Sequence, residues 1–157
     1  DAQDGTDRGM IYWFTGQPGH GKTTLAKAMV AHLEAQGLVV HHVDGDDLRT
    51  LTVNADYTRV GRENNIRKAQ TIAQFLQSKG HTVVVSLVAP YRALREEFKA
   101  RATVTEVYVH TTELRGREDK HASDYEPPME RFIDIDTTGR SVQESLAEVL
   151  DAVSQRS

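Results

Sequence analysis

Short apolar runs alternate with longer amphipathic stretches along most of this chain. Five runs have the length and β-branched content of buried strands: residues 10–14, 38–43, 82–88, 104–109 and 132–136. Helical spacing of apolar residues follows the first run from Leu25 and recurs over residues 62–79, 94–101 and 142–153. This alternation predicts right-handed crossovers and one parallel sheet with helices on both faces.

The composition narrows the class of protein. A length of 157 residues predicts one domain, over residues 10–157, after a polar lead at residues 1–9 that we expect to be disordered. No apolar run approaches the roughly 20 residues of a membrane span, which excludes membrane insertion. A net charge of −4 with scattered basic residues disfavours a duplex nucleic-acid partner. The absence of cysteine fits a reducing compartment, and we expect a cytoplasmic protein.

The loop after the first strand carries the clearest chemical signal. It has the pattern G-x-x-x-x-G-K-T between a strand and a helix, which is the context of a phosphate loop that binds ATP. Lysine at the seventh position reaches the β- and γ-phosphates, and the threonine after it offers a hydroxyl to Mg²⁺. An ordinary glycine-rich turn is the alternative, which this context disfavours. The phosphate loop consists of Gly16, Gln17, Pro18, Gly19, His20, Gly21, Lys22, Thr23 and Thr24.

An acidic turn follows the second strand. Ligands of a parallel sheet gather at the carboxyl ends of its strands, so this turn should lie beside the phosphate loop. A kinase that acts on a hydroxyl benefits from a carboxylate that accepts or orients the proton. We assign that role to Asp46 and place Asp44 nearer the Mg²⁺. The alternative is that the turn only caps the helix after it.

Arginines follow the second and third strands, where they could grip phosphate or sulfate in a bidentate manner. Each of them could instead be a solvated surface residue. The arginines in question are Arg49, Arg62, Arg67, Arg92 and Arg95.

The histidines show no metal-ligand spacing. We interpret His41 and His42 as packing residues of the second strand and His81 as a surface residue, and the role of His121 is left open.

Four motifs together resemble those of the adenylylsulfate kinase family. They are YWFTG at residues 12–16, DGDDLR at 44–49, RENNIRK at 62–68, and SLVAPYR at 86–92 with Arg95 after it. The resemblance extends in order from residue 11 to residue 109 and resumes weakly at residues 125–128 and 135–137. It implies a three-layer α/β fold of the P-loop NTPase type. It also implies an enzyme that uses MgATP to phosphorylate the ribose 3′-hydroxyl of adenosine 5′-phosphosulfate.

The resemblance also implies roles for single residues. Asp46 would serve the acceptor hydroxyl, and Tyr57 stands where the family has a phenylalanine that stacks on the acceptor adenine. Val88 and Ala89 stand where an isoleucine and a serine line the same pocket. Residues that would bind the acceptor are Arg49, Tyr57, Arg62, Asn65, Val88, Ala89 and Arg92.

This sequence departs from the family after Val109. Family members normally have an arginine-aspartate pair, a lysine-glycine-leucine-tyrosine segment and a phenylalanine-threonine-glycine turn there, which form a lid over both substrates. Residues 113–125 are shorter and lack that pattern, Gly61 replaces a common aspartate, and Asn64 replaces a common glutamate.

The sequence thus predicts an ATP-dependent kinase and leaves its acceptor open. Adenosine 5′-phosphosulfate is the first candidate, and a modified nucleotide, a sugar nucleotide or a nucleic-acid base are the others. A regulatory module that binds nucleotide without catalysis is the alternative, which Asp46 disfavours. A homodimer is left open.

Overall fold

A five-stranded parallel sheet forms the centre of the computed structural model, which describes residues 9–113, 116 and 122–156. The central strand β1 (Ile11–Thr15) pairs with β3 (Thr82–Ser86) on one side and β4 (Val104–His110) on the other. The outer strands are β2 (Val40–Asp44), beside β3, and β5 (Phe132–Asp136), beside β4. The spatial order β2-β3-β1-β4-β5 confirms the expected parallel α/β sheet.

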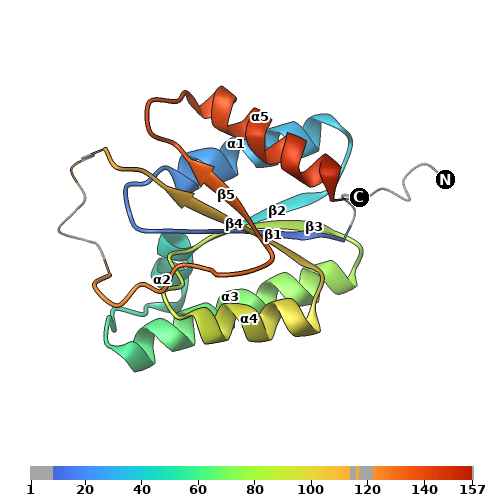
Figure 1. The fold of residues 1–157 in the computed structure, drawn as a ribbon. Helices are drawn as coiled ribbons and strands as arrows, with labels where there is room; N and C mark the ends of the chain where they lie inside the picture. Colours follow the sequence, from blue (N-terminus) through green and yellow to red (C-terminus); the bar gives the residue numbers. More distant parts are fainter. Residues whose placement is uncertain (1–8, 114–115, 117–121, 157) are drawn as a thin grey trace.

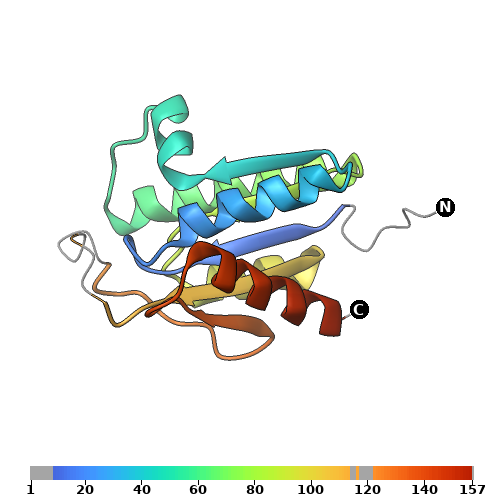
Figure 2. The same ribbon diagram turned by 90° about the horizontal axis from the view of Figure 1, so that it is seen from above.

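Helices cover both faces of this sheet. Figure 1 shows α1 (Lys22–Ala35) and α5 (Val142–Gln155) over one face and α3 (Arg59–Ser78) and α4 (Arg92–Arg101) over the other. Seen from above, α1 and α5 lie side by side (Figure 2). The short helix α2 (Gly45–Thr52) packs against α3 near the strand arrowheads, which point toward the loop after β1. The predicted three-layer arrangement is confirmed.

The central strand explains why its sequence is apolar without alternation. Side chains of a strand point to opposite faces in turn, and here both faces are covered. Ile11 and Trp13 pack toward α3 and α4 with Val83 and Val85. The intervening Tyr12 and Phe14 pack toward α1 and α5, in a second core that includes Met29 and Val149. Burial on both faces holds the end of β1 rigid, and the loop after it starts from a fixed point.

Local backbone geometry moves some element boundaries from their expected places. The first helix begins at Lys22 rather than at Leu25, because the left-handed Gly21 turns the chain directly into it. α3 begins at Arg59 because the Thr58 hydroxyl accepts a hydrogen bond from the Gly61 amide. The capping box of Ser141 and Glu144 is confirmed at the start of α5.

Part of the sequence-based expectation falls on residues outside the described ranges. These are residues 1–8 of the expected lead, most of the shortened stretch after β4, and His121. Gly9 is described, and its carbonyl accepts a hydrogen bond from Gln77 Nε2 on α3 at 2.7 Å. Within the described ranges, each helix is too short or too polar to cross a bilayer.

Candidate active site

The phosphate loop leaves β1 in a conformation that depends on glycine. Gly16, Gly19 and Gly21 all have positive φ angles, and a side chain at Gly16 would collide with the Val109 carbonyl oxygen on β4. Gly21 is the N-cap of α1 and supplies no side-chain cap. The amides of the first helical turn therefore face the loop without a capping side chain, in the arrangement that binds anions at helix N-termini.

Two adjoining cavities of about 350 Å³ each open at this end of the sheet. One lies over the phosphate loop, where Gly19, Gly21 and Thr24 line it. The other extends toward α3 and the loop after β3. Residues that line both cavities are Pro18, Lys22, Thr23, Asp46 and Val88. Residues that line only the second are Asp44, Gly45, Arg49, Tyr57, Arg62, Asn65, Ile66, Ser86, Leu87, Ala89, Pro90, Ala122 and Ser123.

Asp44 connects the acidic turn to the phosphate loop. Its Oδ1 accepts hydrogen bonds from Thr23 Oγ1 at 3.2 Å and from Ser86 Oγ at 2.7 Å. Its Oδ2 accepts from the amides of Asp46 and Asp47, at 3.2 and 3.4 Å, so Asp44 is also the N-cap of α2. Burial acts to raise the pKa of Asp44, but these hydrogen bonds outweigh it and hold the pKa below its ordinary value. The capping alternative thus describes Asp44, which also contacts the threonine expected to hold the metal.

His42 belongs to this network, although its position in a strand suggested simple packing. Its Nε2 lies 2.8 Å from Ser86 Oγ. The Ser86 hydroxyl has one proton and donates it to Asp44, so the hydrogen bond from His42 requires a proton on Nε2. Desolvation by burial lowers the pKa of His42, and its nearby carboxylates do not reverse that shift. His42 therefore donates to Ser86, and Ser86 donates in turn to Asp44.

Two oxygen-bearing side chains of this hydrogen-bond network, Thr23 and Asp44, suit Mg²⁺. The Thr23 hydroxyl and the Asp44 carboxylate are hard oxygen donors of the kind that Mg²⁺ prefers. Among the described residues, no cluster of three or more histidine, aspartate or glutamate side chains could hold a metal by itself. A Mg²⁺ ion that keeps several waters and takes phosphate oxygens as further ligands fits such a sparse set.

The far wall of the second cavity contains a stacked pair. The Arg49 guanidinium carbon lies 3.9 Å from the centroid of the Tyr57 ring, which is 66% exposed. Arg49 Nη1 also donates to the carbonyl oxygens of Asn54 and Asp56, at 3.2 and 3.0 Å. These contacts fix Arg49 against the residue 54–57 loop and leave the Tyr57 ring accessible for stacking.

Asn65 and Gly61 occupy neighbouring turns of α3. Asn65 lines the second cavity, and its amide oxygen is buried and has no hydrogen-bond partner among the described residues. A buried polar atom of this kind is a candidate to bind a donor group of a ligand. At Gly61, a side chain would collide with Asp56. The loop that carries Asp56 can therefore approach α3 this closely only because residue 61 is glycine.

The loop after β3 forms the third wall. Ala89 is buried with a left-handed φ of 46°, and its carbonyl accepts from Arg95 Nη1 at 2.6 Å. Arg92 is the predicted acceptor contact that does not line this cavity. Its Nε donates to the Pro127 carbonyl at 2.8 Å, and its amide donates to Glu126 Oε1. Arg92 holds the residues after the cavity instead of facing into it.

We call residues 122–126 the roof segment, because it lies against the phosphate loop and the loop after β3. Gln17 makes two hydrogen bonds with the Ala122 backbone: Nε2 donates to the carbonyl at 2.9 Å, and the amide donates to Oε1 at 2.8 Å. Thr15 donates its hydroxyl proton to Val88 O, so Tyr125 OH donates to Thr15 Oγ1 at 2.9 Å. The Glu126 amide donates to Pro90 O at 2.8 Å. Sequence motifs gave no sign of these contacts.

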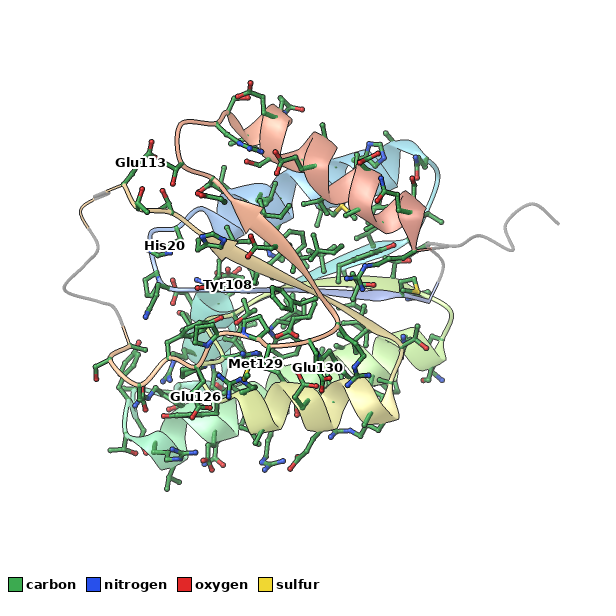
Figure 3. All side chains as sticks on the ribbon, viewed as in Figure 1. His20, Tyr108, Glu113, Glu126, Met129 and Glu130 are labelled. Atoms are coloured by element: carbon green, nitrogen blue, oxygen red, sulfur yellow. The ribbon has the colours of Figure 1, made fainter. Side chains whose placement is uncertain are left out.

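A buried ionic cluster contacts the roof segment through Arg95, whose Nη2 donates to the Glu126 carbonyl. Glu106 on β4 accepts from Arg95 Nε at 2.7 Å and from Lys99 Nζ at 2.6 Å, and all three side chains are nearly inaccessible to water. Lys99 also donates to the Glu130 carbonyl. Figure 3 shows Glu126, Met129 and Glu130 along this stretch beside α4, with His20 and Glu113 at the other side of the strand ends.

Comparison of this chain with known protein families and solved structures agrees with a phosphate-binding site at this position. A family model described as adenylylsulphate kinase matches residues 8–126. The chain belongs to the adenylylsulphate kinase family. Its relatives include the adenylyl-sulfate kinases of Synechococcus sp. (strain JA-2-3B'a(2-13)), 34% identical over 94% of both chains, and of Chloroflexus aurantiacus, 33% identical over 94% of this chain and 90% of that one.

Solved structures show the same likeness. An APS kinase from Mycobacterium tuberculosis in complex with AMPPNP and APS has a TM-score of 0.81 and 27% identity, and the match covers 94% of this chain and 98% of that one. A gluconokinase from Sinorhizobium meliloti, with a TM-score of 0.65 and 18% identity over 92% and 91% of the two chains, shares the fold. The expected family and P-loop fold are therefore confirmed.

Proposed function

We propose that this member of the family transfers the γ-phosphoryl group of ATP to the 3′-hydroxyl of adenosine 5′-phosphosulfate. The observation that carries the proposal is the position of Asp46, which lines both the cavity over the phosphate loop and the adjoining one. A carboxylate between a triphosphate site and a second nucleotide-sized site is placed to orient an acceptor hydroxyl.

The chain's own residues divide between the two substrates. Lys22 and the amides at the start of α1 bind the transferring phosphates and offset the charge that develops on them. Thr23 and Asp44 would hold Mg²⁺, which supplies further charge neutralisation when it is bound. Asp46 orients the acceptor hydroxyl and accepts its proton. Arg49, Arg62 and Asn65 bind the acceptor, while Tyr57 stacks on its base.

The test is release of ADP in a coupled assay with ATP, Mg²⁺ and adenosine 5′-phosphosulfate. Asp46→Asn should lower kcat by about 10²- to 10⁴-fold, the usual contribution of a positioned proton acceptor. Asp47→Asn is the matched control, because it removes the same charge from the next residue, whose carboxylate lines neither cavity.

Each alternative function has its own outcome in this assay. ADP release no faster than background ATP hydrolysis would refute the proposed acceptor, and a panel of other nucleotides would then be screened. Nucleotide binding without turnover of any acceptor would favour the regulatory module. Unchanged turnover in Asp46→Asn would remove Asp46 from the mechanism.

A further inference from the structure

The acceptor-side cavity contains an arginine that is already paired with a carboxylate. Arg62 on α3 lines the cavity, and its Nη1 and Nη2 donate to Asp124 Oδ1 and Oδ2 at 3.0 and 3.2 Å. Asp124 belongs to the roof segment and does not line the cavity itself. The Arg62 and Asp124 side chains are 25% and 41% exposed. This bidentate pair therefore lies at the rim of the cavity, between the acceptor site and solvent.

The pair occupies the donor positions that an anionic ligand would use. Sulfate and phosphate oxygens bind a guanidinium in the same bidentate way as a carboxylate does. Burial acts to raise the pKa of Asp124, but the hydrogen bonds and charge of Arg62 outweigh it and lower that pKa, so Asp124 is ionised near neutral pH. The Arg49 guanidinium, in contrast, donates to backbone oxygens and stacks on Tyr57.

We propose that Asp124 is a specificity-determining residue, an internal counter-ion that an acceptor must displace from Arg62. An acceptor with a phosphate or sulfate near Arg62 replaces one charge-assisted pair by another and releases Asp124 to water. A neutral nucleoside offers Arg62 no charge in exchange, so Arg62 stays with Asp124. This inference rests on the proposed function, because it takes the acceptor cavity as the site of an anionic nucleotide.

Asp124→Asn tests the proposal. A partly exposed ion pair has a modest energy, so the variant should lower KM for adenosine 5′-phosphosulfate by about two- to five-fold. The gain should shrink as salt is raised, because the interaction of Arg62 with the acceptor is screened. Adenosine, tested as a neutral competitive inhibitor, should have the same Ki for both proteins.

Asp134→Asn is the matched control. Asp134 is an exposed carboxylate on β5 that pairs with His110 and lies outside both cavities, so this variant has the same net charge as Asp124→Asn and should keep the original KM. A KM that is unchanged or raised in Asp124→Asn would overturn the proposal, because Asp124 would then be a scaffold or would orient Arg62 for the acceptor. The proposed function would stand in either case, since the original chain would still turn over its acceptor.

A second measurement does not depend on the acceptor. Sodium sulfate, compared with sodium chloride of equal ionic strength, should raise the melting temperature of Asp124→Asn more than that of Asp134→Asn, because Arg62 is open to the anion only in the first. Equal shifts in the two variants would overturn the proposal even if the original chain proved inactive with adenosine 5′-phosphosulfate.

Discussion

At the scale of single residues, the hydrogen bond from Thr23 to Asp44 orients both groups. Thr23 gives its only hydroxyl proton to Asp44 Oδ1, so the lone pairs of Thr23 Oγ1 point away from that carboxylate. Those lone pairs are what a hydroxyl offers to Mg²⁺. Ser86 and the amides of α2 hold Asp44 in place for this purpose. Asp44 therefore prepares the threonine, whether or not it contacts the metal itself.

The depressed pKa of His42 gives the fold a pH dependence that can be measured. Unfolding restores the ordinary value of 6.5, so the unfolded chain binds more protons than the folded chain once the pH falls below about that value. The contribution of neutral His42 to the free energy of unfolding is therefore fully present above that pH, and it is lost progressively as the pH falls below it. His42→Gln keeps a side-chain N–H donor for Ser86 and cannot titrate. Between about pH 8 and pH 5, the free energy of unfolding of the original chain should fall more than that of His42→Gln.

Urea titrations at each pH measure this difference. Parallel pH profiles for the two proteins would contradict the assignment, because they would mean that His42 titrates alike in the folded and unfolded chains.

At the scale of elements, buried ion pairs connect α4 to β4, whereas most other elements pack through apolar side chains. Glu106 lies on a strand of the central sheet and is 1% exposed, with Arg95 and Lys99 of α4 as its two cationic partners. Arg95 also binds the Ala89 carbonyl, which holds a left-handed residue in the wall of the cavity. The ionic cluster therefore links the packing of α4 to the shape of the second cavity.

Glu106→Gln should destabilise the fold strongly, because it leaves the buried Arg95 without a counter-charge and leaves Lys99 with Glu96 alone. Removing one partner of a buried pair typically costs about 3–5 kcal/mol. Urea unfolding measures this, with Glu97→Gln as the control. Glu97 pairs with Arg67 at 3.7 Å on the surface, with both side chains more than half exposed, so its loss should cost less than about 1 kcal/mol. Equal losses in the two variants would show that the buried cluster is dispensable.

At the scale of the whole molecule, the proposed substrates lie at the junction of all three layers. The phosphate loop leads from β1 into α1 on one face, while the second cavity is lined from α3 on the other face. Both cavities lie at the carboxyl end of the sheet. Ligand binding should therefore stabilise the entire domain against unfolding rather than one layer of it.

A non-hydrolysable ATP analogue with Mg²⁺ should accordingly raise the melting temperature. At about 100 times its dissociation constant the ligand adds about 2.7 kcal/mol, which for a domain of this size is about 5–10 °C. Chelation of Mg²⁺ should reduce the shift, and Lys22→Ala should nearly abolish it. A shift of full size in Lys22→Ala would show that the analogue binds elsewhere.

Much of the architecture could be predicted from the sequence because it depends on local patterns. The strand at residues 132–136, the capping box at Ser141 and the order of strands and helices follow from periodicity and short-range hydrogen bonds. Glycine spacing similarly marked the phosphate loop. The predicted roles of the site residues stay predictions. The structure places most of these residues around the two cavities, while Gly16, Gln17, His20 and Arg92 line neither.

The parts that sequence reasoning missed depend on contacts between distant residues. Ser86 contacts Asp44 because β3 pairs with β2. The sequence around Ser86 contains no pattern that predicts a partner 42 residues away. In the sequence, Asp124 does not differ from other surface carboxylates, and only the fold places it beside Arg62. The orientation of the Arg92 side chain likewise depends on a distant contact, its hydrogen bond to the Pro127 carbonyl.

The two hydrogen bonds between Gln17 and Ala122 have a consequence for sequence drift in this lineage. Gln17 contributes its side chain, whereas residue 122 contributes only backbone groups, which every amino acid except proline supplies in full. These hydrogen bonds therefore constrain position 17 to a side-chain amide, while at position 122 they exclude only proline. Close homologues that share this contact should retain glutamine at the first site and show no correlated substitution at the second, so covariation methods would fail to detect the pair.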